Sequence, residues 1–478
     1  MTNSQSDILL QATELYSENP AIITKSKTLT FSELNSIVKK AVANLSSIGF
    51  RKGEILAVLD RNSIDYVTAF WTAHRMGLVL MPLNINTSAS DWGEQIAAAK
   101  CRVLLYAKDY SQYFNTAQNS LPLKMLSGRP LHDSSTNYIP SANDDAVIMF
   151  SSGSTGKPNS IVLSRDNLYH SATGANKAIL VTPDNTWLAV LPFYHIGGLS
   201  ILYRAALSGS AVYVFPEFST IEIISCIEQQ DSVLLSVVPT MLKELMKLDK
   251  DNSLASCKAI ILGGAGFDDG LKNSIIEKRL PVLTTYGMTE TSSMVTLLPL
   301  TDAGNRLDTS GTVLSEREVK ISDDKHILVR GKTVFSRKVD GQKMNKSDDW
   351  FDTGDIGRIS EDGYLTVTGR AGRMIVSGGE NIDLTRIENE LLAISGVDGA
   401  IVMSRSDKKW GARPVAFVKA TDIKLSDSMI CAIISDKLGK IYIPDRIVFL
   451  NNIPLTGSGK IDLVAIKNKH SELFVESA

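Results

Sequence analysis

A loop rich in glycine and hydroxyl side chains is the first stretch of this sequence whose residues could do chemistry. Glycines let backbone N–H groups come close to an anion, and hydroxyls add donors, so such a loop could bind phosphate. It is not the usual nucleotide-binding loop, because only two residues separate its glycines and a proline follows its lysine. A plain surface turn is the alternative. The loop consists of Ser151, Ser152, Gly153, Ser154, Thr155, Gly156 and Lys157.

An isolated arginine stands in an apolar segment, and a histidine precedes it. Arg204 is the only charged residue between His195 and Glu217. Arginine is almost never buried without a partner, so this guanidinium either reaches the surface along its apolar stem or binds a carboxylate of a ligand. His195 is either a core residue or a part of the same site.

Further motifs follow the loop in order, and together they resemble the adenylate-forming superfamily. That superfamily includes acyl- and aryl-CoA ligases, peptide-synthetase adenylation domains and firefly luciferase. Each motif alone is weak, but five in this order form a specific pattern that covers nearly the whole chain. The resemblance implies an enzyme that activates a carboxylic acid with ATP, forms an acyl-adenylate and passes the acyl group to a thiol. The four later motifs are TTYGMTET (284–291), WFDTGDIG (350–357), GRAGRMIVSGGENI (369–382) and PLTGSGKID (454–462).

The resemblance implies a nucleotide site in which the loop at 151–157 follows the triphosphate. It assigns Tyr286 to stacking on adenine, Thr289 to a phosphate contact and Glu290 to Mg²⁺, an ion that prefers oxygen ligands. A strand end followed by a helix cap is the alternative for Thr289 and Glu290. Asp355 matches the carboxylate that accepts both ribose hydroxyls. The remaining nucleotide-binding residues implied are Gly263, Gly264, Ala265, Gly287 and the ribose contact Arg370.

Lys460 matches the lysine that bridges the acid and the α-phosphate. Negative charge builds on phosphorus when one anion attacks another, so a positive charge there favours the transition state. A solvated lysine in a mobile loop is the alternative. The resemblance also implies a mobile C-terminal domain that pivots at Arg373, and a pantetheine tunnel lined by Gly378 and Gly379.

The chain departs from the superfamily pattern at three positions. Asn159 and Ser160 replace the Lys-Gly that usually follows the loop, which removes one positive charge. Arg373 stands where relatives usually carry Asp or Lys. These departures leave a catalytically degenerate nucleotide-binding module as one alternative.

Within the superfamily the chain most resembles the o-succinylbenzoate–CoA ligases of menaquinone biosynthesis. They read much like GLSILYRAALSG (198–209), YGMTET, SGGENI and DKKWG (407–411). Their substrate is a dicarboxylate, which would give Arg204 its partner, and His195 matches a histidine near the reacting carboxylate and the pantetheine tunnel. No carrier domain follows, so coenzyme A is the expected acceptor. A medium-chain or aryl acyl-CoA synthetase is the alternative.

The elements that position these residues follow an α/β pattern. Strands are predicted at 55–59, 187–191, 232–238 and 259–262, and helices at 64–78, 240–248 and 269–278. Apolar strands that alternate with helices are typical of mostly parallel sheets. Turn signals become frequent after about residue 300, and a new α+β pattern begins at 382. It has helices near 384–394 and 426–438 and strands at 400–403 and 415–418.

We therefore predict a large N-terminal α/β domain over 1–369 and a small, mobile α+β C-terminal domain over 370–478. The chain has 478 residues with 21% charged side chains and a formal net charge of -2, which indicates no attraction to nucleic acid or anionic membranes. The four cysteines are far apart, which argues against a zinc site or a disulfide framework. The N-terminus lacks signal-peptide features, so a cytoplasmic protein without membrane insertion, possibly a homo-oligomer, is expected.

Overall fold

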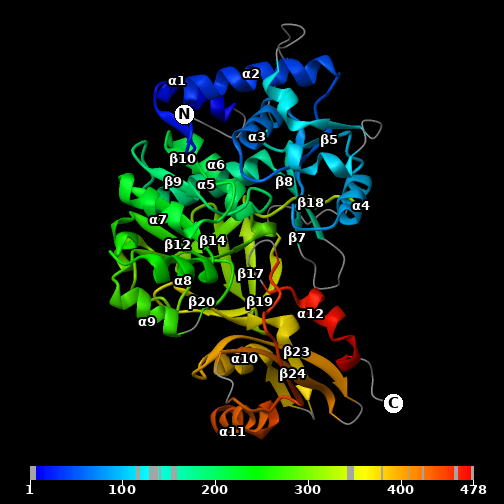
Figure 1. Cartoon of the computed structure of the whole chain (residues 1–478), viewed down its shortest axis with the longest axis vertical. Helices are drawn as coiled ribbons and strands as arrows, with labels where there is room; N and C mark the ends of the chain where they lie inside the picture. Colours follow the sequence, from blue (N-terminus) through cyan, green and yellow to red (C-terminus); the bar gives the residue numbers. More distant parts are fainter. Residues whose placement is uncertain are drawn as a thin grey trace.

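The computed structural model describes residues 7–114, 119–128, 138, 141–151, 159–267, 269–341, 349–377, 380–407, 410–421, 425–456 and 461–474. Two mostly parallel sheets build the larger part of the molecule. The C-terminal segment forms a smaller part at the end of the long axis that lies away from the N-terminal helices α1 (Ile8–Tyr16) and α2 (Phe31–Ser47) (Figure 1). The predicted α/β class is confirmed. Among the described residues, no helix is both long and apolar enough to cross a bilayer.

The first large sheet has nine strands in the order β15-β14-β13-β12-β11-β9-β10-β1-β2. Its centre is parallel from β13 to β1, and antiparallel pairs lie at both edges. The strands are β1 (Pro20–Ile23), β2 (Thr28–Thr30), β9 (Thr186–Ala189), β10 (Ala211–Val214), β11 (Val233–Val237), β12 (Ala259–Leu262), β13 (Val282–Met288), β14 (Ser293–Leu297) and β15 (Thr312–Val313).

The second large sheet has seven strands in the order β18-β8-β7-β4-β3-β5-β6, and it is parallel from β7 to β6. The strands predicted at 55–59, 187–191, 232–238 and 259–262 are confirmed as β3, β9, β11 and β12, because continuous apolar runs suit strands buried on both faces. The strands of this sheet are β3 (Ile55–Leu59), β4 (Val79–Pro82), β5 (Val103–Tyr106), β6 (Ser120–Pro122), β7 (Asp145–Ser151), β8 (Asn159–Ser164) and β18 (Arg337–Lys338).

Helices connect the parallel strands, and one apolar core joins both sheets. It includes Val67 and Phe70 on α3 as well as Trp187 and Leu188 on β9. The three helices predicted in this part are confirmed as α3, α8 and α9. The helices are α1 (Ile8–Tyr16), α2 (Phe31–Ser47), α3 (Ile64–Met76), α4 (Ala89–Ala99), α5 (Arg165–Ile179), α6 (Ile196–Ser208), α7 (Thr220–Gln229), α8 (Pro239–Leu248) and α9 (Asp269–Glu277).

An antiparallel four-stranded sheet, in the order β16-β17-β19-β20, leads to the C-terminal part. The next sheet begins only three residues later and has the order β22-β21-β24-β23, with β25 beside β24. The strands are β16 (Arg317–Ile321), β17 (His326–Gly331), β19 (Phe351–Ile359), β20 (Leu365–Arg370), β21 (Met374–Ser377), β22 (Glu380–Asp383), β23 (Val397–Asp407), β24 (Gly411–Ala420) and β25 (Arg446–Phe449).

The C-terminal sheet packs its helices on both faces. α10 (Leu384–Leu392) and α11 (Asp427–Leu438) share one apolar cluster with it, and α12 (Leu463–Lys469) contributes to another. Both helices predicted here are confirmed. The predicted strands 400–403 and 415–418 are the buried centres of β23 and β24, which run longer because their polar ends also pair in register.

Candidate active site

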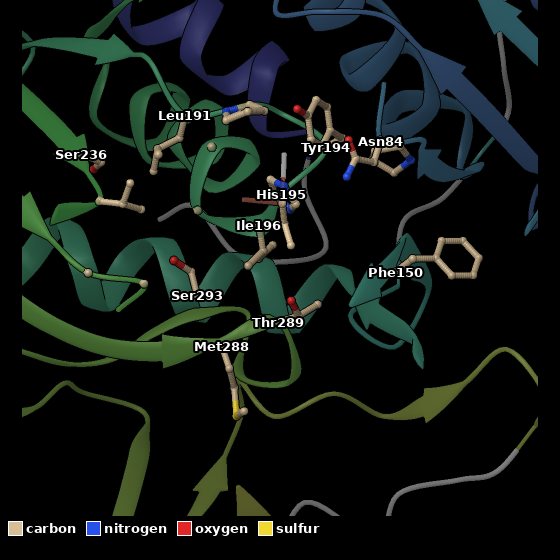
Figure 2. A pocket seen from close by; sticks show the side chains of 18 of the residues that line it. Asn84, Phe150, Leu191, Tyr194, His195, Ile196, Ser236, Met288, Thr289 and Ser293 are labelled. Atoms are coloured by element: carbon tan, nitrogen blue, oxygen red, sulfur yellow. The ribbon is translucent and has the colours of Figure 1, made fainter. Parts of the chain in front are cut away.

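A cavity of about 490 Å³ opens at the carboxyl ends of parallel strands from both large sheets. Its walls include Asn84 beyond β4, the loop beyond β9, Ser236 on β11, Gly263 beyond β12 and Gly287 on β13. Binding crevices of open α/β sheets form at this edge, because the connecting loops converge there. Figure 2 shows His195 and Ile196 on one wall of the cavity, with Ser293 and Thr289 across from them.

His195 lies where the loop beyond β9 becomes helix α6, at the N-cap position. Its main-chain N–H donates to Pro192 O (3.1 Å), and its carbonyl accepts from the N–H groups of Gly198 and Leu199. A Cβ at Gly198 would lie 2.3 Å from Pro192 O, so only glycine lets the helix start so close to the loop. The tight turn directs His195 to the cavity wall.

Arg204 lies on α6 and also lines the cavity, although only 1% of the residue is exposed. The interpretation that its guanidinium reaches the surface is wrong. Its Nη2 donates to Ser293 Oγ (3.1 Å), and the guanidinium lies 5.6 Å from the Trp187 ring centre. Within the described residues it forms no ion pair, and its Nε has no hydrogen-bond partner.

Burial lowers the pKa of Arg204 to about 9, and the positive Arg317 adds to this effect. The pKa stays above neutral, so the guanidinium is charged at pH 7. A charged, incompletely bonded guanidinium at a cavity wall favours an anionic ligand, because its burial costs free energy until a partner arrives.

Three residues of the predicted nucleotide site are brought together by the strands β13, β19 and β20. The Tyr286 hydroxyl donates to Asp355 Oδ2 (2.7 Å), and Arg370 Nε lies 3.6 Å from Asp355 Oδ1. Asp355 and Arg370 are direct partners in the β19–β20 ladder. Burial raises the pKa of Tyr286, and the Asp355 carboxylate adds to this effect, so the phenol stays neutral. The cluster places an aromatic ring beside a carboxyl group.

The turn after β13 forms part of the cavity wall. Thr289 lines the cavity and begins a short 3₁₀ helix, Thr289–Thr291, so it is a strand-end residue as well. Gly287 passes so close to the next strand that a Cβ would lie 1.9 Å from Ser293 O. Of the predicted glycine-rich loop beyond β12, Gly263 and Gly264 line the cavity, whereas Ala265 is exposed and does not.

Glu290 follows Thr289 and is half-buried. Within the described part of the chain, no group of three or more His, Cys, Asp or Glu side chains could hold a metal ion. A single carboxylate still fits Mg²⁺, which keeps several waters and is usually held by one or two carboxylates together with substrate phosphates.

Residues on both sides of 457–460 line the cavity, namely Leu455 and Thr456 before it and Asp462 and Val464 after it. The C-terminal part therefore contributes to the wall of the cavity. Lys460 itself lies outside the described residues. So do Gly378, Gly379 and the loop residues Ser152, Gly153, Ser154, Thr155, Gly156 and Lys157, and of Ser151 only the backbone, at the end of β7, is described.

Arg373 ends the short 3₁₀ helix Ala371–Arg373 between β20 and β21. Its Nη2 forms an ion pair with Glu388 Oε1 on α10, and that oxygen also accepts from Val402 N (2.7 Å). Burial raises the pKa of Glu388, and the positive Arg373 opposes this rise. The side chain at the predicted pivot is thus tied to the C-terminal sheet and its helix.

Sequence reasoning missed two residues that organise the site. Ser293 accepts a hydrogen bond from Arg204. The backbone of Ser293 has φ +93°, a left-handed conformation that cannot be predicted from a serine in the sequence. Asn62 holds the loop of His195 through partners 127 to 131 positions away, so no local spacing could indicate it. The only local signal is a polar turn directly after a buried strand.

The chain is similar to known proteins over nearly its whole length. The model of AMP-binding enzymes matches residues 9–336, and the model of their C-terminal domain matches 386–460. A 2-succinylbenzoate–CoA ligase of Listeria monocytogenes serotype 4b (strain F2365) is 30% identical over 473 residues, which cover 97% of this chain and 99% of that protein. The enzyme of that name from Enterococcus faecalis (strain ATCC 700802 / V583) is 29% identical and covers 96% and 97%.

Among solved structures, the o-succinylbenzoate CoA synthetase of Bacillus subtilis in complex with the acyl-adenylate intermediate OSB-AMP has a TM-score of 0.87 at 28% identity, covering 96% of this chain and 97% of that one. The same enzyme with ATP and magnesium ion also has a TM-score of 0.87, at 27% identity, with 95% and 98% covered. The match of the family model over most of the chain, together with these relatives, shows that the chain belongs to the family of AMP-binding enzymes.

Proposed function

We propose that this protein is a 2-succinylbenzoate–CoA ligase of menaquinone biosynthesis, the activity that names its relatives from Listeria and Enterococcus. In the first half-reaction a carboxylate oxygen of the acid attacks the α-phosphorus of ATP, and pyrophosphate leaves. In the second, the sulfur of coenzyme A attacks the acyl carbon, its proton is lost and AMP leaves. The products are the thioester, AMP and pyrophosphate.

The observation that carries the proposal is Arg204, a buried cation on the cavity wall that has no acidic partner within the described residues. 2-Succinylbenzoate has two carboxylates, one that reacts and one that must stay charged inside the protein. A buried carboxylate needs a cation or several donors. Arg204, with Ser293 beside it, supplies both kinds of partner, whereas a fatty acid would leave the guanidinium unpaired.

For the nucleotide, we propose that the Tyr286 ring packs against adenine while Asp355 accepts the ribose hydroxyls. Arg370 and Tyr286 hold the Asp355 carboxylate in place from two sides. Thr289 contacts phosphate from the cavity wall, and the loop 151–157 follows the leaving pyrophosphate. When Mg²⁺ is bound at Glu290, it supplies charge that stabilises the departing phosphates.

We propose that the chain divides into domains at 369–370, where one sheet ends and the next begins, and that the C-terminal domain moves between the half-reactions. The supporting observation is that residues flanking 457–460 line the cavity, which agrees with a role of Lys460 in adenylation. Coenzyme A must reach the same acyl carbon afterwards, so this segment has to withdraw. Arg373 is the proposed pivot, and Gly378 and Gly379 line the tunnel that then forms.

The test is a comparison of acids with the purified protein. ATP–pyrophosphate exchange reports the first half-reaction, and thioester formation with coenzyme A reports both. We expect kcat/KM for 2-succinylbenzoate to exceed the values for benzoate and octanoate. Equal or better use of octanoate would favour a medium-chain acyl-CoA synthetase, and absence of exchange with every acid would favour a degenerate nucleotide-binding module.

A further inference from the structure

The loop between β9 and α6 forms a wall of the cavity and carries His195, yet it has little regular structure of its own. Within it, Val190 N donates to Leu188 O and His195 N donates to Pro192 O. Three other backbone groups, the carbonyls of Ala189 and Leu191 and the N–H of Phe193, are bonded by one side chain from a distant segment. The shape of the wall therefore depends on that side chain.

That side chain is Asn62, of which only 4% is exposed. Its Nδ2 donates to Ala189 O (3.1 Å) and Leu191 O (3.0 Å), and its Oδ1 accepts from Phe193 N (2.8 Å). Both amide hydrogens and one oxygen lone pair are used, so the amide matches the loop in polarity and number of partners. Any other conformation of the loop would leave these buried polar groups without hydrogen-bond partners, which costs free energy, so the bonds to Asn62 stabilise this conformation.

Asn62 belongs to the other sheet, since it lies in the turn between β3 and α3. This turn is rigid, because Ser63 Oγ donates to Asp60 Oδ2 (2.5 Å), Arg61 N donates to Asp60 Oδ1 (2.7 Å) and Tyr66 N donates to Ser63 Oγ. Asn62 thus connects the carboxyl ends of β3 and β9, strands of two different sheets, at the edge where the cavity opens.

Apolar packing strengthens the same connection. The Phe193 ring is fully buried and lies 5.4 Å, centre to centre, from the ring of Tyr66 on α3. The next two residues, Tyr194 and His195, line the cavity. Asn62 itself does not line it, so any effect of Asn62 on the reaction must pass through the loop.

We propose that Asn62 is a positioning residue that fixes the loop Ala189–Phe193 and thereby sets Tyr194 and His195 at the reacting acyl group. This inference rests on the proposed function for its effect on turnover. The nucleotide cluster of Tyr286, Asp355 and Arg370 stands on other strands, so the binding of ATP does not depend on Asn62.

The test compares Asn62→Ala with Asn44→Ala. Asn44 is a matched control, because it is 7% exposed and its Nδ2 likewise donates to the carbonyls of a remote loop, those of Met125, Leu126 and Gly128, which are not part of the cavity wall. Both variants should lower Tm. Only Asn62→Ala should lower kcat for thioester formation, by about ten- to a hundred-fold, since small misplacements of reacting groups have effects of that size.

The KM for ATP should stay within about two-fold of wild type in both variants, because neither substitution removes a contact to the nucleotide. A kcat for Asn62→Ala equal to that of Asn44→Ala would overturn the proposal and leave Asn62 a structural residue. If Asn62→Ala does not fold, Asn62→Asp serves instead, since it keeps the size and the acceptor for Phe193 but loses both donors. An unchanged kcat in a folded Asn62→Asp would equally overturn it.

Hydrogen–deuterium exchange without substrates separates this inference from the proposed function. Peptides that cover 189–195 should exchange faster in Asn62→Ala than in wild type or Asn44→Ala, whatever acid the enzyme uses. If exchange is faster in Asn62→Ala but the enzyme does not use 2-succinylbenzoate, the proposed substrate is refuted and the positioning role of Asn62 is supported. Unchanged exchange would refute the positioning role, even in an active 2-succinylbenzoate–CoA ligase.

Discussion

At the scale of single residues, the charge of Arg204 is the main feature of the site, because no acidic side chain in the described part of the chain pairs with it. Arg204 is buried among apolar side chains and bonded to one serine hydroxyl, so its charge is incompletely compensated. A ligand carboxylate would restore the missing interactions. The strength of a charge-assisted hydrogen bond, about 1.5–3 kcal/mol, then sets the size of the effect on affinity.

The replacement Arg204→Leu should raise the KM for 2-succinylbenzoate about ten- to a hundred-fold. This factor is the free energy of the lost charge-assisted hydrogen bond converted to a change in affinity. The KM for ATP should change little, and simple monocarboxylates should be used as well as before or better. The measurement is kcat/KM for 2-succinylbenzoate, benzoate and octanoate in wild type and variant. An equal loss for all three acids would identify Arg204 as structural.

We propose that Lys460 supplies a second charge, and residues that flank 457–460 line the cavity. Lys460→Ala should lower the rate of adenylate formation by at least about a hundred-fold, as removal of one electrostatic group does elsewhere. Transfer from a supplied acyl-adenylate to coenzyme A should persist, because no charge builds on phosphorus in that step. Pyrophosphate exchange near the wild-type rate would contradict this role.

At the scale of elements, the buried strands and their helices could be predicted from apolar runs such as Ile55–Leu59 and Ala259–Leu262. Local motifs also indicated Tyr286 and Asp355, and the structure places these two side chains in hydrogen-bond contact. The contacts between distant turns could not be predicted, because Asn62 meets its loop only after two sheets have packed. Neither could the burial of Arg204, since a helix pattern does not tell which face meets another element.

The turn between β3 and α3 carries a titratable group of its own, Asp60, which Ser63 and the Arg61 N–H hold in place. Burial raises the pKa of Asp60 to about 6 from its ordinary value of 3.8, although the hydrogen bonds from Ser63 and Arg61 oppose the shift. Between these two values the folded protein binds more protons than the unfolded chain. The contribution of Asp60 to stability is therefore fully present at acidic pH and is lost as the pH rises through about 6.

Asp60→Asn removes this titration while keeping the size of the side chain. Between pH 5 and pH 7.5 the free energy of unfolding of wild type should fall relative to that of Asp60→Asn by about 1 to 1.5 kcal/mol. Urea unfolding of both proteins across this range is the measurement, and the other titrating groups cancel in the difference. Parallel curves for the two proteins would show that Asp60 does not titrate there.

At the scale of the whole molecule, the cavity lies where three parts of the chain meet. Parallel strands of both large sheets direct their carboxyl ends toward it, and residues beside 457–460 add to its wall from the C-terminal part. We propose that this arrangement serves adenylation. If the C-terminal domain moves before transfer to coenzyme A, as we propose, the connection between β20 and β21 must change its backbone angles.

Arg373 stands in that connection, and Arg373→Pro should slow thioester formation about ten-fold or more while adenylation remains measurable, because proline fixes φ near −65° and removes an N–H. Rapid-quench measurement of each half-reaction gives the comparison. Glu388→Gln is the matched control, since it breaks the ion pair of Arg373 but leaves the backbone of the connection free to rotate. Equal slowing of both half-reactions in Arg373→Pro would contradict a pivot at this residue. If Glu388→Gln reproduces the effect of Arg373→Pro, the ion pair of the side chain and not a pivoting backbone governs the second half-reaction.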